Sequence, residues 1–171
     1  MTDVLIIGAG IAGMTAAVVS SNAGLSVRLI DKTGLAMSAN DFSCFSSIPF
    51  FNGLTPLNIC EILAKDIEKC GIELTPAKAV SVSKGEDSFK VMCDIGDFFS
   101  RAVIISAGKQ NSISYPNAEC HPEIDESCRL ALPGLMLCGN ARREAGLLRC
   151  MADGLVCGET AAEWVKSKFY A

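Results

Sequence analysis

A glycine-rich turn near the first residue constrains the fold of this chain more than any other feature. The apolar run of residues 3–7 leads without a spacer into Gly8-Ala9-Gly10-Ile11-Ala12-Gly13. A helical pattern follows, and a second apolar run over residues 26–30 ends at Asp31. Strand, glycines, helix, strand and acid stand in the order of a dinucleotide-binding βαβ unit, which the sequence therefore predicts. The alternative is a chance glycine-rich turn within a βαβ unit.

Each part of this pattern has a mechanical role. Gly8 permits a tight turn after the strand, Gly10 lets the backbone approach a pyrophosphate, and Gly13 lets the helix pack closely on the sheet. The start of the helix offers N–H groups and the positive end of its dipole to that pyrophosphate. Asp31, about 20 residues beyond the glycines, can accept hydrogen bonds from a ribose 2′-OH.

Length and composition predict one domain that buries much apolar surface. The chain has 171 residues, of which 50% are hydrophobic, and its mean hydropathy is +0.34. Two interpretations fit: a buried parallel sheet, or a subunit that also buries a face against a partner. The net charge is −4 and the pI is near 5.0. Because no basic cluster exceeds Arg142-Arg143, nucleic acid is not an expected partner.

The sequence also predicts a cytoplasmic protein with no membrane partner and no metal. No apolar run reaches the roughly 18 residues of a membrane span, and the first residues lack the basic region of a signal peptide. The nine cysteines are scattered without metal-clip spacing, and their number is odd. We therefore expect most of them to be reduced, small hydrophobic residues of the core.

A clear helix is expected after the first βαβ unit. Thr55 is its expected N-cap, Pro56 its first residue and Gly71 its stop. A short strand is expected over residues 72–74. The apolar face of the helix comprises Leu57, Ile59, Cys60, Leu63, Ala64 and Ile67.

The next segment distinguishes this fold from a domain that binds NAD alone, in which another helix should follow. Residues 79–83, 89–93 and 97–100 instead predict three short strands separated by turns. This β-meander leads into a buried strand over residues 101–105. Two-domain flavoproteins use such a crossover in place of a helix.

The last part of the chain is expected to hold a loop over residues 109–122, a buried strand over 135–138 and a final helix over 147–166. The expected buried residues of that helix include Met151, Leu155, Ala162 and Trp164.

Four separated motifs together resemble one family. They are the turn from Gly8 to Gly13 with Asp31, and residues 48–53 (IPFFNG), 103–108 (VIISAG) and 133–140 (PGLMLCGN). In this order they are similar to the FAD domain of the low-molecular-weight thioredoxin reductases, within the pyridine nucleotide–disulfide oxidoreductase superfamily. The resemblance covers nearly the whole chain. It implies FAD as cofactor and an α/β, Rossmann-like FAD-binding fold, with a central parallel sheet, helices and a three-stranded β-meander crossover in a single domain, residues 1–171.

The resemblance implies a role for each residue that matches a motif. Gly8, Gly10 and Gly13 would hold the pyrophosphate and Asp31 the adenosine ribose, while backbone near Ala79 would meet the adenine. Amides that open the last helix would face the flavin N1/C2=O edge and stabilise the negative charge that develops there on reduction. The full set expected to bind the cofactor is Gly8, Gly10, Ile11, Ala12, Gly13, Asp31, Lys32, Ala79, Ala107, Gly108, Gly139, Asn140, Leu147, Leu148 and Arg149.

This chain departs from the family in three ways, which restrict the family properties that the resemblance implies for it. In the family, an NADPH domain is inserted between two portions of the FAD domain. The matching portions of this chain are residues 1–108 and 133–171, and only the loop of residues 109–132 lies between them. The family's redox Cys-x-x-Cys lies on that domain, and no such spacing occurs in this chain. Asn140 replaces an aspartate that binds the ribityl chain, and its amide can hydrogen-bond a hydroxyl without charge.

Two cysteines are candidates for a catalytic thiol. Cys44 lies in the stretch expected near the flavin, and Cys150 lies in the first turns of the last helix, where a thiol pKa can be lowered. The alternative is that both are buried apolar cysteines. His121 is expected to be a solvated loop residue, and residues 142–144 are expected to be surface charges, with binding of a phosphate or an acidic donor as their alternative.

The pattern as a whole implies an FAD-binding oxidoreductase related to thioredoxin reductase. Electrons would move through flavin N5, and a redox partner protein or a small electron donor would replace the NADPH domain. Loss of that domain implies exposed apolar surface, so we expect a homodimer or a hetero-complex. One alternative is a non-catalytic flavin-binding scaffold or sensor subunit of a redox complex. Another is an NAD(P)-binding regulatory subunit, which the β-meander disfavours.

Overall fold

A computed structural model of the chain describes residues 1–34, 54–108, 112–116, 124–130, 132–142 and 146–170. It has the mixed α/β composition that the sequence predicts. In chain order the elements are β1 (Thr2–Ile7), α1 (Ile11–Asn22), β2 (Val27–Asp31), α2 (Pro56–Lys69), β3 (Glu73–Pro76), β4 (Ala79–Lys84), β5 (Phe89–Cys93), β6 (Gly96–Ile105), β7 (Leu135–Leu137), a 3-10 turn (Gly139–Ala141) and α3 (Leu147–Phe169).

The central sheet is parallel, and an antiparallel meander joins it at β6. Parallel pairing runs through β3, β2, β1, β6 and β7. Strands β4 and β5 pair antiparallel, and β5 pairs antiparallel with the first half of β6. The predicted fold class and the predicted meander are both confirmed.

Strand β6 differs from the sequence prediction, which placed two strands over residues 97–100 and 101–105. The structure has one continuous strand, Gly96–Ile105. At the expected break, Ser100 pairs with Thr2 of β1 on one side and with Phe89 of β5 on the other. Because both edges of the strand are hydrogen-bonded at this fully buried residue, the backbone has no reason to turn there.

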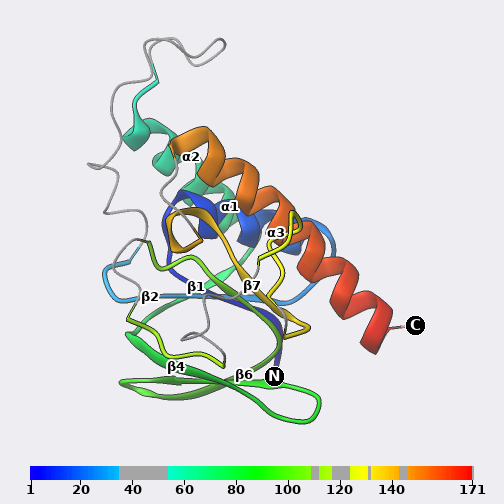
Figure 1. Cartoon of the computed structure of the whole chain (residues 1–171). Coiled ribbons are helices and arrows are strands. Elements are labelled where there is room, and N and C mark those ends of the chain that lie inside the picture. The colour runs from blue at the N-terminus through cyan, green and yellow to red at the C-terminus, as the bar shows by residue number, and fades with distance from the viewer. Residues whose placement is uncertain (35–53, 109–111, 117–123, 131, 143–145, 171) are drawn as a thin grey trace.

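Two apolar layers cover the two faces of the sheet. Successive side chains of a strand point to opposite faces, so neighbouring residues of one strand enter different layers. Val4 and Ile6 of β1 pack in the layer under the helices. Leu5 and Ile7 pack in the layer under the meander. Figure 1 shows this arrangement, with α1, α2 and α3 on one side and the strands of the meander on the other.

Helix α2 begins as predicted. Thr55 is the N-cap, its hydroxyl accepts a hydrogen bond from Asn58 N at 3.2 Å, and the Asn58 side chain accepts one from Thr55 N at 2.9 Å. Gly71 follows the helix with a positive φ of 63°. Leu57 was expected on the buried face but is 57% exposed, because it lies in the first turn, ahead of the buried Ile59 and Cys60.

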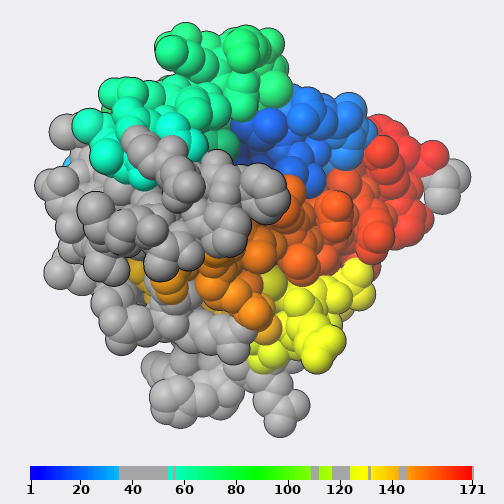
Figure 2. All heavy atoms as spheres, turned by 90° about the horizontal axis from the view of Figure 1, so that it is seen from above, coloured from blue at the N-terminus to red at the C-terminus, as the bar shows by residue number. Residues whose placement is uncertain are grey.

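Helices α1 and α3 lie directly against each other, and α3 crosses the surface beside α1 in Figure 2. A Cβ added at Gly154 would come within 2.5 Å of Ala12 O, and one added at Gly158 within 2.7 Å of Val19 Cβ. These glycines therefore define the face of α3 that packs on α1. Leu155 lies off that face and is 46% exposed, so its predicted burial is wrong.

The described helices include none that is long and apolar enough to cross a membrane.

Candidate functional site

The turn between β1 and α1 is built by three glycines with different surroundings. Gly8 has φ of 106°, and a Cβ there would lie 2.5 Å from Ser106 O. A Cβ at Gly13 would overlap the carbonyl oxygen of Gly8. At Gly10 an added Cβ would meet none of the described residues within 4 Å. Gly8 and Gly13 therefore permit close packing, whereas Gly10 leaves open space at the helix N-terminus.

Ser106 supports this turn, a role that its place in the sequence motif did not predict. Its hydroxyl lies 2.7 Å from Gly8 O and 3.0 Å from Ile7 O, and it donates to this pair of carbonyls. Ser106 immediately follows β6, so it ties the end of one parallel strand to the turn after its neighbour. The sequence signal was a small polar residue at the end of an apolar strand, in the segment Ser106-Ala107-Gly108.

Two adjoining cavities lie at the carboxyl ends of the parallel strands, where α/β sheets bind their ligands. Gly8, Asp31 and Ala107 line both, so the cavities form one groove. The cavity at the start of α1 has a volume of about 110 Å³ and is lined by Gly8, Gly10, Ile11, Ala12, Asp31, Ser106, Ala107, Gly108, Asn140 and Cys150. The other has a volume of about 90 Å³ and is lined by Ile7, Gly8, Ile30, Asp31, Lys32, Ala77, Lys78, Ala79, Ala107, Ser112 and Ile113.

The groove brings together most of the residues that the sequence analysis assigned to the cofactor. Gly13 and Gly139 do not line it. A Cβ at Gly139 would lie 2.8 Å from Ala12 Cβ and 3.6 Å from Cys150 Sγ, so this glycine allows the 3-10 turn to approach the first turn of α1.

The first turn of α1 is well suited to an anion. Its N-cap, Gly10, provides no side-chain cap, and the turn contains no acidic residue. Ile11 and Ala12, the first two residues of the helix, line the cavity, and no N-cap side chain hydrogen-bonds to this end of the helix. Uncapped amides and the positive end of the helix dipole together favour a phosphate group.

Asp31 lies where the two cavities meet. Its Oδ2 accepts a hydrogen bond from Ala9 N at 2.8 Å, and its Oδ1 accepts from Thr33 N at 2.7 Å and from the Thr33 hydroxyl at 2.8 Å. A carboxylate has about four acceptor sites, so Asp31 retains capacity for a ligand hydroxyl while these bonds hold it in place.

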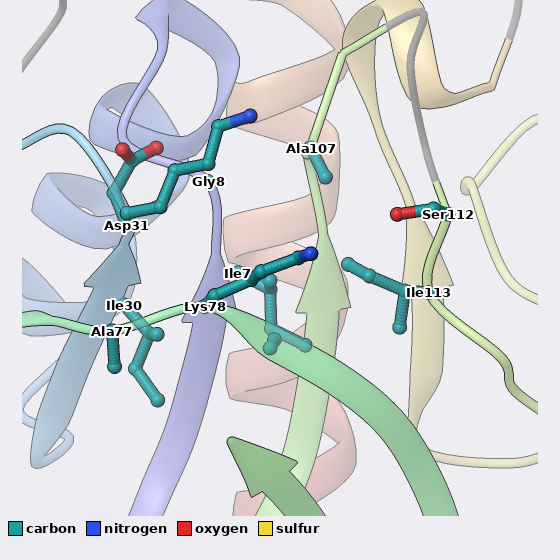
Figure 3. A pocket seen from close by; sticks show the side chains of 11 residues that line it. Ile7, Gly8, Ile30, Asp31, Ala77, Lys78, Ala107, Ser112 and Ile113 are labelled. Carbon is teal, nitrogen blue, oxygen red and sulfur yellow. The ribbon is translucent and has the colours of Figure 1, made fainter. Parts of the chain in front are cut away.

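The second cavity has a mixed polar and apolar lining. Figure 3 shows Asp31 beside Gly8 on one side of it and Ser112 and Ile113 on the other, with Lys78 extending between them. Lys78 was not singled out by sequence, because it stands in the connection before β4 without a motif. Its backbone N–H donates to Asp94 Oδ1 at 2.9 Å, which fixes the backbone beside Ala79.

The residues that open α3 lie outside both cavities. The helix starts after Gly146, which provides no side-chain cap. Leu147 is buried, whereas Leu148 is 43% exposed. Arg149 Nε donates to Asp153 Oδ1 at 3.0 Å. Their predicted contact with the flavin ring stays a prediction.

Cys150 lies in the groove, but its environment opposes a thiolate and agrees with the alternative interpretation, a buried apolar cysteine. Burial raises its pKa, the charge of Asp153 and the neighbouring Cys138 raise it further, and a hydrogen bond from the Asn140 backbone only partly compensates. The expected lowering at a helix N-terminus is therefore reversed. Cys150 Sγ also lies 3.8 Å from Asn140 Oδ1. The other candidate, Cys44, lies outside the described residues, as do residues 48–53 and His121.

Arg142 is not the surface charge that the sequence suggested. Its side chain is only 10% exposed and pairs with the buried Asp153 at 3.4 Å. It also donates to Asp125 O at 2.9 Å and to Cys128 Sγ at 3.2 Å. Arg143 and Glu144 lie outside the described part of the chain. Across that part, no three His, Cys, Asp or Glu side chains are placed to hold a metal ion.

Comparison with known proteins agrees with this geometry. Residues 3–53 match the model of a family described as an FAD binding domain. Over 108 residues the chain is 32% identical to a thioredoxin reductase of Bacillus subtilis (strain 168), a match that covers 63% of this chain and 34% of that protein. The chain is related to thioredoxin reductase, and its cofactor is FAD. It spans about a third of the length of this curated relative.

Solved structures show the same fold. A thioredoxin reductase from Lactococcus lactis superposes with a TM-score of 0.83 at 12% identity, covering 98% of this chain and 100% of that chain. A ferredoxin-flavin thioredoxin reductase from Clostridium acetobutylicum superposes with a TM-score of 0.85 at 12% identity, covering 99% of each chain. At this identity the likeness concerns the fold alone.

Proposed function

We propose that this FAD-binding relative of thioredoxin reductase is an oxidoreductase unit. Its electron donor and acceptor are separate molecules and not a domain inserted between β6 and β7. The observation that carries the proposal is the groove at the carboxyl ends of β1, β2 and β6. It combines an open, uncapped helix start at Gly10 with the carboxylate of Asp31 and the amide of Asn140. FAD bound there supplies two-electron chemistry at flavin N5.

The residues of the groove fit the parts of FAD in sequence along its length. The amides of Ile11 and Ala12 would bind the pyrophosphate. Asp31 would accept hydrogen bonds from the adenosine ribose, and Ala79 would border the adenine. Asn140 would meet the ribityl hydroxyls at the other end of the groove. The chain thus orients the cofactor with backbone amides and two polar side chains, and it provides the electrostatic surroundings rather than a nucleophile.

The short connection between β6 and β7 supports the need for a separate electron donor. Residues 106–134 link these two paired strands. A folded domain has about 50 residues or more, so this connection has no room for one. A redox partner protein or a small donor that reaches the flavin would supply the electrons.

The experiment compares reduction of the bound flavin by different donors. Purified protein is loaded with FAD, its visible spectrum is recorded, and it is mixed anaerobically with NADPH, NADH, reduced ferredoxin or a dithiol in a stopped-flow instrument. We expect a flavin spectrum that at least one donor bleaches within seconds. A flavin that binds but that none of these donors reduces would support the scaffold or sensor alternative. A protein that stays colourless in excess FAD would contradict both the oxidoreductase proposal and the scaffold or sensor alternative.

A further inference from the structure

A cluster of thiols lies beside the FAD groove and has no part in the function proposed above. Cys128 lies in the segment 124–130, Cys138 follows β7, and Cys157 lies on α3. All three are fully buried. The Cys157 side chain interacts with those of both Cys128 and Cys138, and its Sγ lies 3.6 Å from Leu137 O. Thiols from three separate elements therefore converge on Cys157.

The backbone holds Cys128 in place against α3. Cys128 N donates to Asp125 O at 3.0 Å, and Leu137 N donates to Cys128 O at 3.1 Å. One turn further along α3 from Cys157, the Thr160 hydroxyl donates to Ser127 O at 3.1 Å. Two successive residues of the segment thus contact two positions on the same face of α3.

Cys128 has surroundings that favour its thiolate form. The Arg142 guanidinium donates to its sulfur at 3.2 Å, a contact that favours a thiolate. The hydrogen bond from Cys157 lowers the pKa of Cys128, burial opposes this, and the charge of Arg142 lowers the pKa further. Cys128 is also the one non-glycine residue of the described chain with a positive φ, at 62°. Such strained conformations concentrate at functional sites.

We propose that Cys128 and Cys157 form a thiol pair that a hydroperoxide oxidises to a disulfide, with Cys128 reacting first. Cys138 also contacts Cys157, but the described contacts give it no guanidinium donor. A small oxidant fits the location, because Cys128 is buried but stands in the chain between the half-buried Ser127 and the exposed Arg129. Figure 2 shows the segment at the surface beside α3.

The reaction balances with hydrogen peroxide as the oxidant. The Cys128 thiolate attacks one peroxide oxygen, an S–O bond forms, the O–O bond breaks, and the leaving hydroxide takes up a proton as water. The Cys157 sulfur then attacks the sulfenic sulfur. An S–S bond forms, the S–O bond breaks, and the Cys157 proton leaves with a second water. The two thiols lose two electrons, the peroxide gains them, and an added dithiol reverses the change by exchange.

The test is a disulfide map of the FAD-loaded protein. The protein is reduced, freed of dithiol, treated with an equivalent of hydrogen peroxide, alkylated and digested without reduction. We expect a linked pair of peptides containing Cys128 and Cys157, lighter than the two reduced peptides by the two thiol hydrogens and separated by dithiothreitol. Linkage of Cys157 to Cys138, or a Cys128 that remains fully alkylatable after peroxide, would overturn the proposal.

Substitutions separate the role of Cys128, which reacts with peroxide, from the role of Cys157, which attacks the sulfenic acid. In Cys157→Ser we expect a sulfenic acid at Cys128 that dimedone traps, and in Arg142→Gln a several-fold slower loss of the Cys128 thiol. Cys93→Ser is the matched control, because Cys93 is a buried thiol whose pKa is raised to about 11 by burial and nearby carboxylates. It should leave the linked peptides unchanged. If a variant fails to fold, the map of the unsubstituted protein still decides the question.

Discussion

At Gly10 the backbone leaves a space that a single methyl group would enter. Because an added Cβ meets no atom of the described residues within 4 Å there, Gly10→Ala should cost the apo-protein no more than about 1 kcal/mol, the usual effect of losing a good N-cap residue. The methyl would occupy the position expected for the pyrophosphate, so FAD should bind at least about tenfold more weakly, or about 1.4 kcal/mol. FAD titration and urea unfolding of the apo-protein measure the two effects.

Gly13 provides the contrasting variant. Its added Cβ would overlap the Gly8 carbonyl, so Gly13→Ala should destabilise the apo-protein itself, by about 3 kcal/mol. An unchanged FAD affinity in Gly10→Ala would show that the pyrophosphate lies elsewhere.

Protonation of the Asp3 carboxylate should contribute to the loss of stability in acid, because Asp3 is the carboxylate among the described residues whose pKa is clearly lowered. Burial alone would raise its pKa, but hydrogen bonds from Ser26 and Tyr170 and the charge of Arg101 outweigh burial and hold the pKa below 3.8. The unfolded chain therefore binds this proton more readily. The stabilisation is present above pH 3.8 and is lost as the pH falls through the folded-state pKa.

Asp3→Asn should remove this effect. The Asp3 side chain is only 9% exposed, so we expect a loss of about 2 kcal/mol at neutral pH and a flatter dependence of stability on pH below 4. Urea unfolding at several pH values measures both. Asp97→Asn is the control, because the Lys90–Asp97 pair is largely exposed and should contribute less than about 1 kcal/mol. Equal losses in the two variants would contradict this account.

At the scale of elements, the contact between α1 and α3 positions the groove. Gly154 and Gly158 let α3 approach α1 closely, and this contact brings Cys150 and the Gly139–Ala141 turn beside the first turn of α1. The helix pair therefore places the uncapped N-terminus of α1 in the same cavity as Asn140.

Gly158→Ala tests this packing. A Cβ there would lie 2.7 Å from Val19 Cβ, which costs roughly 2 kcal/mol, and the better helix propensity of alanine returns about 1 kcal/mol. We expect a net loss of about 1 kcal/mol together with weaker retention of FAD. The exposed neighbour provides the control, since Glu159→Ala should change stability by less than about 0.5 kcal/mol. Unaltered stability and FAD retention in Gly158→Ala would show that the helix pair tolerates a wider spacing.

At the scale of the whole molecule, apolar side chains remain at the surface of two helices. Leu57 and Ile62 of α2 are 57% and 48% exposed, and Leu148 and Leu155 of α3 are 43% and 46% exposed. Burial of such surface favours association, so we propose a homodimer or a hetero-complex. Sedimentation velocity of the FAD-loaded protein should show a species of at least twice the 18.0 kDa chain mass. A single monomeric boundary at every concentration would argue for a protein that works alone.

The fold and the cofactor could be predicted from sequence because both depend on local patterns. Alternating or continuous apolar runs defined β1 and β5, and the Thr55 cap defined the start of α2. The three glycines and Asp31 specified a dinucleotide site because each backbone requirement there is met by few residue types.

The remaining features depend on tertiary contacts that no local pattern encodes. Strand β6 is continuous because neighbouring strands pair with it on both sides at Ser100. Leu155 is exposed because another face of α3 packs on α1. The raised pKa of Cys150 depends on Asp153 and on burial, neither of which its position in the helix reveals. Ser106 supports the turn through contacts with residues about a hundred positions earlier in the chain.

Strand β6 has a mechanical consequence for the molecule. Its first half belongs to the meander, and its second half ends beside the glycine turn between β1 and α1. A force that peels the meander from the protein would travel along one unbroken backbone to Ser106 and loosen the carbonyls that it holds. We therefore expect fraying of this distant hairpin to weaken retention of the coenzyme.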